Sequence, residues 1–345
     1  MNEQEIIDKI GGLRSGLKAD RLDMSFGEIM NIYESDDLII SPEYQRAYRW
    51  SNVQKTRFIE SLLLGIPVPP IFVAEDDEGK WELVDGLQRI STVLSFFGVL
   101  KDKVKNNLTL GESSLIEEIL KDKNKDNIPK KLLLSIKRSV CRVEILRWDS
   151  GFDMRYELFN RLNTGGSPLS EQEIRNCVFR GDFNQMINQL AIKLEPLIKG
   201  LEKKKDKMYL EEMVLRYFAI IKKHNNWEIK SNIQLYLTDF MKHETKKETF
   251  DYNIEKEKFV KIVNFLSEED NLFSGKQQFS AGSYDTVMYL VYDYIEIPQY
   301  NVKSFAEKVK KVLSNAEYKT LAGHGTSNTR RFVDKLKKAK ELFDE

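Results

Sequence analysis

The alternation of apolar and polar residues changes character near residue 150. Before that point, short β-rich runs occupy residues 38–40, 71–74, 81–84 and 140–145, and amphipathic stretches occupy residues 52–64 and 87–97. The polar residues between the second and third runs suit a hairpin turn. The two amphipathic stretches have the apolar spacing of helices with one buried face. The pattern predicts an α+β domain over residues 1–150.

Beyond residue 150, long amphipathic stretches replace the β-rich runs. Their apolar spacing predicts helices at residues 152–162, 171–179, 183–194, 210–223, 233–241, 256–266, 284–294, 302–313 and 329–343. Ser170, with Glu173 three residues later, has the form of a capping box, which marks a helix start. The pattern therefore predicts a second, mostly α-helical domain over residues 151–345.

Composition fits a globular chain and identifies no partner. Of the 345 residues, 41% are hydrophobic and 31% are charged, and 54 basic side chains balance 54 acidic ones. A neutral chain offers no general attraction to nucleic acid or membrane. Residues 121–142 and 301–345 are locally basic, but solvated helix faces commonly have this composition.

The sequence lacks the marks of an oxidising or membrane environment. Cys141 and Cys177 have no paired-cysteine spacing, so we expect neither a disulfide framework nor a zinc knuckle. The first residues are acidic and contain no apolar signal segment. The longest apolar run, residues 62–74, contains three prolines and is too short to span a bilayer. We expect a cytoplasmic protein without a membrane partner.

The strongest candidate for chemistry is Asp85-Gly86-Leu87-Gln88-Arg89, where a β-rich run meets a predicted helix. Free N–H groups at a helix start favour an anion, and glycine lets a ligand approach the backbone. Arg89 can bind phosphate oxygens in a fork, and Asp85 can hold a divalent metal or orient a water. A purely structural alternative makes Asp85 the helix cap and pairs Arg89 with a surface acid.

Two further clusters carry candidate ligand residues. Residues 44–50 begin with Tyr44, Gln45 and Arg46 and place arginines between aromatic rings, which suits phosphates and a stacked base. The aromatic residues are equally suited to anchoring a core. Residues 159–176 contain a pair of glycines, and a turn between two helices is a sufficient explanation for them. Asn163 and Arg175 are the spare polar groups there, and they bear on the site only if this turn folds back over it.

Other well-known binding and catalytic motifs are not found in the sequence. Residues 11–18 approach a phosphate-binding P-loop, but Leu17 stands where that loop needs lysine. His224, His243 and His324 have no metal-ligand spacing, and no Ser/His/Asp or Cys/His arrangement is visible.

Four separated blocks, residues 44–50, 60–67, 85–89 and 159–175, resemble in order and spacing the N-terminal domain of GmrSD-type restriction systems. The resemblance covers roughly residues 25–180. That family is similar to the ParB/sulfiredoxin fold and includes the N-terminal module of the phosphorothioate-sensing anti-phage protein SspE. The resemblance implies a ParB/sulfiredoxin-like domain followed by the α-helical one.

The resemblance also implies a module that binds and hydrolyses a nucleoside triphosphate (NTP) with Mg²⁺, in defence against foreign DNA. It makes Asp85, Gln88 and Arg89 catalytic, with Asp85 as the magnesium ligand. The nucleotide-binding residues would be Tyr44, Gln45, Arg46, Gly86, Asn163 and Arg175. In this hypothesis Arg46 and Arg89 stabilise charge on the phosphates. The helical domain would contact DNA, a companion nuclease or defence protein, or a second copy of the chain.

This sequence departs from the family pattern at two places. Leu87 stands where many members have glutamine, which puts a polar contact to the nucleotide in doubt. The second half shows only three scattered histidines, so we expect no HNH nuclease there.

Two alternatives to NTP hydrolysis stay open. One is a nucleotide-switched module that binds DNA or protein without turnover. The other is a ParB-like nuclease, for which the sequence offers only Glu75, Asp76, Asp77 and Glu82 as acids near Asp85.

Overall fold

The structure is a computed structural model of the 345-residue chain. It describes residues 2–15, 19–40, 50–76, 78–147, 156–157, 160–161, 169–197, 208–222, 232–247, 251–269, 280–297, 301–322 and 329–345. The chain forms two compact units, Met1–Pro168 and Leu169–Glu345. The units divide after Pro168, whereas the apolar pattern put the domain boundary after residue 150.

The first unit combines a sheet with short helices. Its described elements are α1 (Glu3–Ser15), β1 (Ala19–Ser25), α2 (Phe26–Glu34), β2 (Leu38–Ile39), α4 (Asn52–Leu64), β3 (Ile71–Glu75), β4 (Trp81–Asp85), α5 (Leu87–Phe97), η1 (Lys103–Lys105), α6 (Glu117–Leu120), α7 (Lys130–Arg138) and β5 (Val140–Arg147). The helices predicted at residues 52–64 and 87–97 are confirmed to the residue, and the four predicted strands are confirmed as β2 to β5.

The sheet is mixed and has the strand order β1-β5-β3-β4-β2. The predicted hairpin is confirmed, because β3 and β4 pair antiparallel. The Asp76 side chain fixes its turn by accepting hydrogen bonds from the backbone N–H groups of Glu78 and Lys80, at 3.0 and 2.8 Å. Strand β3 pairs parallel with β5, and β2 pairs parallel with β4. The α+β class is therefore confirmed, while the ParB/sulfiredoxin relation stays a prediction.

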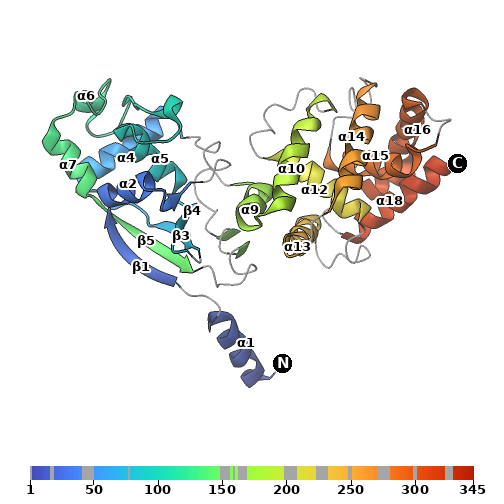
Figure 1. The fold of residues 1–345 in the computed structure, drawn as a ribbon, viewed down its shortest axis with the longest axis horizontal. Coiled ribbons are helices and arrows are strands. Elements are labelled where there is room, and N and C mark those ends of the chain that lie inside the picture. Colours follow the sequence, from blue (N-terminus) through green and yellow to red (C-terminus); the bar gives the residue numbers. More distant parts are fainter. Residues whose placement is uncertain are drawn as a thin grey trace. The chain divides into compact units, whose positions relative to one another are not determined.

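Helices α2, α4, α5 and α7 gather on one side of this sheet (Figure 1). Ile59 of α4 and Leu94 of α5 are fully buried there, as is Val73 of β3. Helix α4 begins at a capping box formed by Ser51 and Gln54, and ends at Gly65, whose φ of 70° lies in the left-handed region. These two signals explain why the sequence predicted the bounds of α4 correctly.

The second unit is helical throughout its described part. Its elements are α9 (Glu171–Val178), α10 (Asp182–Lys193), η2 (Glu195–Leu197), α12 (Tyr209–Ile221), α13 (Ile233–Thr245), α14 (Asn253–Ser267), α15 (Ala281–Tyr294), α16 (Val302–Ser314), α17 (Ala316–Ala322) and α18 (Thr329–Asp344). The Ser170 capping box is confirmed, since Ser170 and Glu173 bond reciprocally at the start of α9. The predicted helical character of this half is confirmed.

Helix α12 lies at the centre of this unit and packs against α10, α13 and α15. Its residues Tyr217 and Phe218 are fully buried, and Phe218 packs edge-on against Phe183 of α10, with ring centroids 6.2 Å apart. Among the described residues, no helix has both the length and the apolar character that a membrane span needs.

Candidate functional site

The candidate site lies where β4 ends and α5 begins. Asp85 is the last residue of the strand, and Gly86 forms the turn with a φ of 100°. A Cβ at Gly86 would lie 2.4 Å from the Ile71 Cγ2 atom. Both the left-handed backbone and this close approach require glycine, so the junction is built around Gly86.

Arg89 holds the carboxylate of Asp85 from the first turn of α5. Its Nη2 atom lies 2.7 Å from Asp85 Oδ2, and its Nη1 donates to the carbonyl oxygen of Pro70 at 2.9 Å and also to that of Pro69. The Arg89 side chain is 13% exposed and that of Asp85 is 40% exposed. Arg89 is thus fixed by the protein, while much of the Asp85 carboxylate faces solvent.

The start of α5 has no side-chain cap. Gly86 is the N-cap residue, and the first helical hydrogen bond runs from the N–H of Ile90 to the Gly86 carbonyl. Asp85 therefore does not act as the helix cap, and Arg89 pairs with Asp85 itself rather than with a distant surface acid. The backbone N–H groups in the first turn of a helix favour an anion, and at the start of α5 no side-chain cap bonds to them.

Gln88 turns toward the segment that leads into α4. Its Oε1 accepts a hydrogen bond from the backbone N–H of Trp50 at 3.0 Å. The Trp50 ring packs edge-on against Phe58 of α4, with centroids 5.7 Å apart. Gln88 therefore fixes the backbone of Trp50, two residues before the start of α4. Tyr44, Gln45, Arg46 and Asn163 lie outside the described residues.

Leu87 and Cys141 add apolar surroundings to the junction. Leu87 is 8% exposed, so this position of the motif contributes to the core. Cys141 on β5 is buried near Arg89, and burial raises the pKa of its thiol to about 11, against which the positive charge of Arg89 acts. At neutral pH the thiol is therefore protonated, which excludes it as an activated nucleophile.

Arg175 has a different environment, inside the helical unit. Its side chain is fully buried, its Nε donates to Gln172 Oε1 at 2.8 Å, and its Nη1 donates to Gln234 Oε1 at 3.0 Å. Nη2 lies 3.3 Å from Glu212 Oε2. These bonds give Arg175 a structural role in the unit, and its predicted contact with nucleotide stays a prediction.

Glu212 connects Arg175 to a longer buried ion cluster. Arg216 Nε lies 2.9 Å from Glu212 Oε1, and Arg216 Nη1 lies 3.0 Å from Asp285 Oδ2. Burial alone would raise the pKa of the Glu212 carboxyl, but attraction by Arg216 and Arg175 outweighs it and holds that pKa below its ordinary value. The cluster therefore ties α9, α12 and α15 together.

Metal binding at the junction would depend on Asp85. In the described part of the chain, no group of three or more His, Cys, Asp or Glu side chains is placed to hold a metal ion. Glu75 accepts a hydrogen bond from the Trp81 indole at 3.0 Å, and Asp76 serves the hairpin turn. A single carboxylate suits Mg²⁺ only when phosphate oxygens and waters complete its shell, as in many nucleotide sites.

Sequence reasoning included Trp50 in the cluster of residues 44–50, but it missed the contact of its backbone N–H with Gln88 and the contacts of the Pro69 and Pro70 carbonyl groups with Arg89. The proline pair directly before β3 was visible, but no local signal shows that these carbonyls meet a guanidinium nineteen and twenty residues away.

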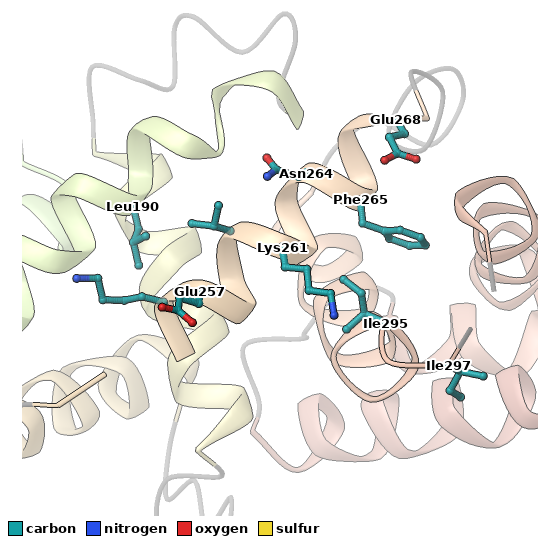
Figure 2. Close-up of a pocket in the computed structure, with 10 residues that line it drawn as sticks. Leu190, Glu257, Lys261, Asn264, Phe265, Glu268, Ile295 and Ile297 are labelled. Atoms are coloured by element: carbon teal, nitrogen blue, oxygen red, sulfur yellow. The ribbon is translucent and has the colours of Figure 1, made fainter. Parts of the chain in front are cut away.

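A separate groove of about 770 Å³ runs along α14 in the helical unit. Figure 2 shows Lys261, Asn264 and Phe265 on α14 with Ile295 and Ile297 nearby. Its charged lining residues are two lysines and two glutamates, so its charge does not favour a phosphate. The groove therefore offers no rival to the strand-to-helix junction as an anion site.

Comparison with protein families gives a match that lies largely in the first half of the chain. Residues 26–180 match the model of the GmrSD restriction endonuclease N-terminal domain. Neither a comparison with curated proteins nor one with solved structures gives a match. The GmrSD N-terminal domain links the chain to restriction-type defence systems and encloses the whole Asp85 to Arg89 junction.

Proposed function

We propose that the junction from Asp85 to Arg89 binds the phosphates of a nucleoside triphosphate and hydrolyses it slowly. The observation that carries this proposal is the uncapped start of α5 beside a solvent-facing carboxylate that Arg89 holds in place. The helix start supplies donors for phosphate oxygens. The carboxylate can accept a hydrogen bond from a water molecule or bind a metal ion. The match to the GmrSD N-terminal domain supports a role in defence.

Asp85 and Arg89 take distinct roles in this proposal. Asp85 would bind Mg²⁺ together with the phosphates or orient the attacking water; bound Mg²⁺ would neutralise developing phosphate charge. Because Arg89 uses both Nη atoms on protein oxygens, we assign it to positioning Asp85. Direct charge stabilisation at the phosphates then falls to Arg46, as the sequence suggests.

The remaining parts of the function rest on the family context. The helical unit would sense DNA, a companion nuclease or another defence protein, and nucleotide turnover would set its state.

The central test is phosphate release with each of the four common NTPs and Mg²⁺. We expect Asp85→Asn to reduce release to the level of the buffer blank. Asp36→Asn is the matched control, because it removes an exposed acid of the same unit, and asparagine tolerates the left-handed backbone at that position (φ 67°). Equal release by wild type and Asp85→Asn would remove Asp85 from the chemistry.

A second experiment separates hydrolysis from binding alone. Calorimetry with each NTP would detect association in the wild type, and product analysis of the same sample would detect turnover. Binding without product would favour the nucleotide-switched module, in which the same junction serves only as a receptor. Nicking of a plasmid with Mg²⁺ or Mn²⁺ would instead support the nuclease alternative.

The positioning role of Arg89 is tested by Arg89→Lys. Lysine keeps the charge but cannot reproduce the forked bonds to Asp85 and the two proline carbonyls. We expect a fall in kcat of about tenfold or more with KM for NTP nearly unchanged. A rise in KM with kcat retained would show that Arg89 contacts the phosphates directly.

A further inference from the structure

Strand β1 forms an edge of the sheet along its whole length. It pairs with β5 on one side, in continuous register from Ala19 opposite Leu146 to Ser25 opposite Val140. Among the described residues, no strand pairs with its other side (Figure 1). A seven-residue edge leaves a row of backbone N–H and C=O groups for another strand.

Several devices that usually protect such an edge are missing from β1, although three of its seven residues are charged. Its sequence contains neither proline nor lysine, and its register with β5 has no bulge. Leu22 is 44% exposed at the centre of the strand. The strand also precedes residues 26–180, so it lies outside the GmrSD match.

The charges on β1 and β5 form an ordered pattern on one face of this ribbon. Arg21 stands opposite Glu144, with Nε and Oε2 3.0 Å apart, and Asp23 stands opposite Arg142, with Oδ1 and Nε 2.9 Å apart. Arg21 and Asp23 lie on the same face because they are two residues apart. Both side chains are more than half exposed, so both can also meet a strand on the outer side.

We infer that β1 pairs antiparallel with β1 of a second copy of this chain, centred on Leu22. A twofold axis through this position places Arg21 opposite Asp23 of the second copy, and Asp23 opposite Arg21 of the second copy. The side chains in each row across the four strands then alternate between negative and positive charge. One such row runs from Glu144 and Arg21 of one copy to Asp23 and Arg142 of the second copy. The two Leu22 side chains meet on the other face and cover each other.

Neighbouring registers are opposed by charge. We consider only pairings that keep the helices of both copies on the same side of the joined sheet. The two such registers nearest to the proposed one have Arg21 or Asp23, in place of Leu22, at their centre. Those registers place two arginines or two aspartates directly opposite each other, which is destabilising. The sequence of β1 therefore selects a second copy of itself in one register.

The test exchanges charges between two full-length variants. Arg21→Asp gives a strand with two facing acids, and Asp23→Arg gives one with two facing arginines. We expect the wild type to sediment as a dimer and each variant alone to dimerise about tenfold more weakly or worse. An equimolar mixture of the two variants should regain dimerisation, because each acid then faces an arginine.

Arg147→Asp is the matched control for this test. It breaks the Arg147–Asp20 ion pair of the same ribbon, at 2.7 Å and similar exposure, without changing the facing pairs. Thermal unfolding of every variant shows that it is folded. A monomeric wild type, a dimer that both variants leave intact, or a mixture that stays monomeric would each overturn the inference.

Cross-linking tests the register separately. Under mild oxidation, Leu22→Cys should form a disulfide-linked dimer, because the two side chains lie directly opposite each other. Leu115→Cys, at a side chain 67% exposed elsewhere in the unit, is the control. Cross-linking of Leu22→Cys no faster than the control would contradict pairing centred on Leu22.

Discussion

The two units use arginine and carboxylate pairs in opposite ways. At the end of β4, Arg89 holds one oxygen of Asp85, and the aspartate side chain stays 40% exposed. In the helical unit, the Arg175 side chain is fully buried and Glu212 bridges it to Arg216. Arg89 and Arg175 both lie within residues 26–180, which match the family model. The position of these two arginines in the sequence does not distinguish their roles. The exposure of the carboxylate that each one contacts does, because a ligand can reach Asp85 more readily than the largely buried Glu212.

The largest expected effect concerns the buried cluster. Glu212→Ala leaves Arg175 and Arg216 in a dry interior without their shared carboxylate, so the free energy of unfolding should fall by about 3–5 kcal/mol. Denaturant unfolding of the helical unit measures this loss. The control Glu257→Ala removes an exposed acid of α14 and should change stability by about 0.5 kcal/mol or less. Equal losses in both variants would show that Glu212 has no special role.

The second effect concerns the glycine of the candidate site. Gly86→Ala combines a left-handed backbone with a Cβ placed 2.4 Å from Ile71, and should lower the free energy of unfolding by about 2–4 kcal/mol. Gly65→Ala is the control, because it has a φ of 70° but open space around its Cβ. We expect about 1 kcal/mol there. Equal losses would mean that the approach of Ile71 to Gly86 is relieved without cost.

The sequence predicted α4 and α5 better than it predicted polar contacts, although it missed α1, α2 and α7. Helix α4 was predicted to the residue because apolar spacing, a serine cap and Gly65 agree locally. Strand β1 was missed because it is an edge strand in which Met24 is buried while Asp20 to Asp23 are exposed, so it shows no apolar alternation. The Asp85 and Arg89 pair lies within one motif and could be proposed from sequence. The burial of Arg175 depends on α12 and α13, which no local pattern places.

The third effect depends on pH and on Glu60, a buried carboxylate of α4. Burial alone would raise the pKa of Glu60, but hydrogen bonds from the backbone N–H groups of Ile116 and Leu115, both at 2.8 Å, outweigh it and lower that pKa. A lowered pKa in the folded state stabilises the protein above the unfolded-state pKa of about 4.3. This contribution is lost as the pH falls through the folded-state value.

Glu60→Gln should therefore cost about 1–3 kcal/mol at pH 7, and this difference from wild type should shrink as the pH falls below about 4. Parallel denaturant titrations at pH 7, 5 and 3 measure it. A difference that stays constant with pH would show that the carboxylate charge does not stabilise residues 114–116, and that any loss comes from packing.

The smallest effect compares two helix starts. The Ser170 side chain accepts a hydrogen bond from the Glu173 N–H at 3.2 Å, whereas α5 begins without a side-chain cap. Ser170→Ala should lower the free energy of unfolding by about 1 kcal/mol, and Ser170→Thr should largely preserve it. If α5 is the open start that receives phosphate, the rise in melting temperature caused by Mg²⁺ and NTP should be unchanged in Ser170→Ala and absent in Asp85→Asn. A lost nucleotide response in Ser170→Ala would instead bring α9, and with it Arg175, back into the binding site.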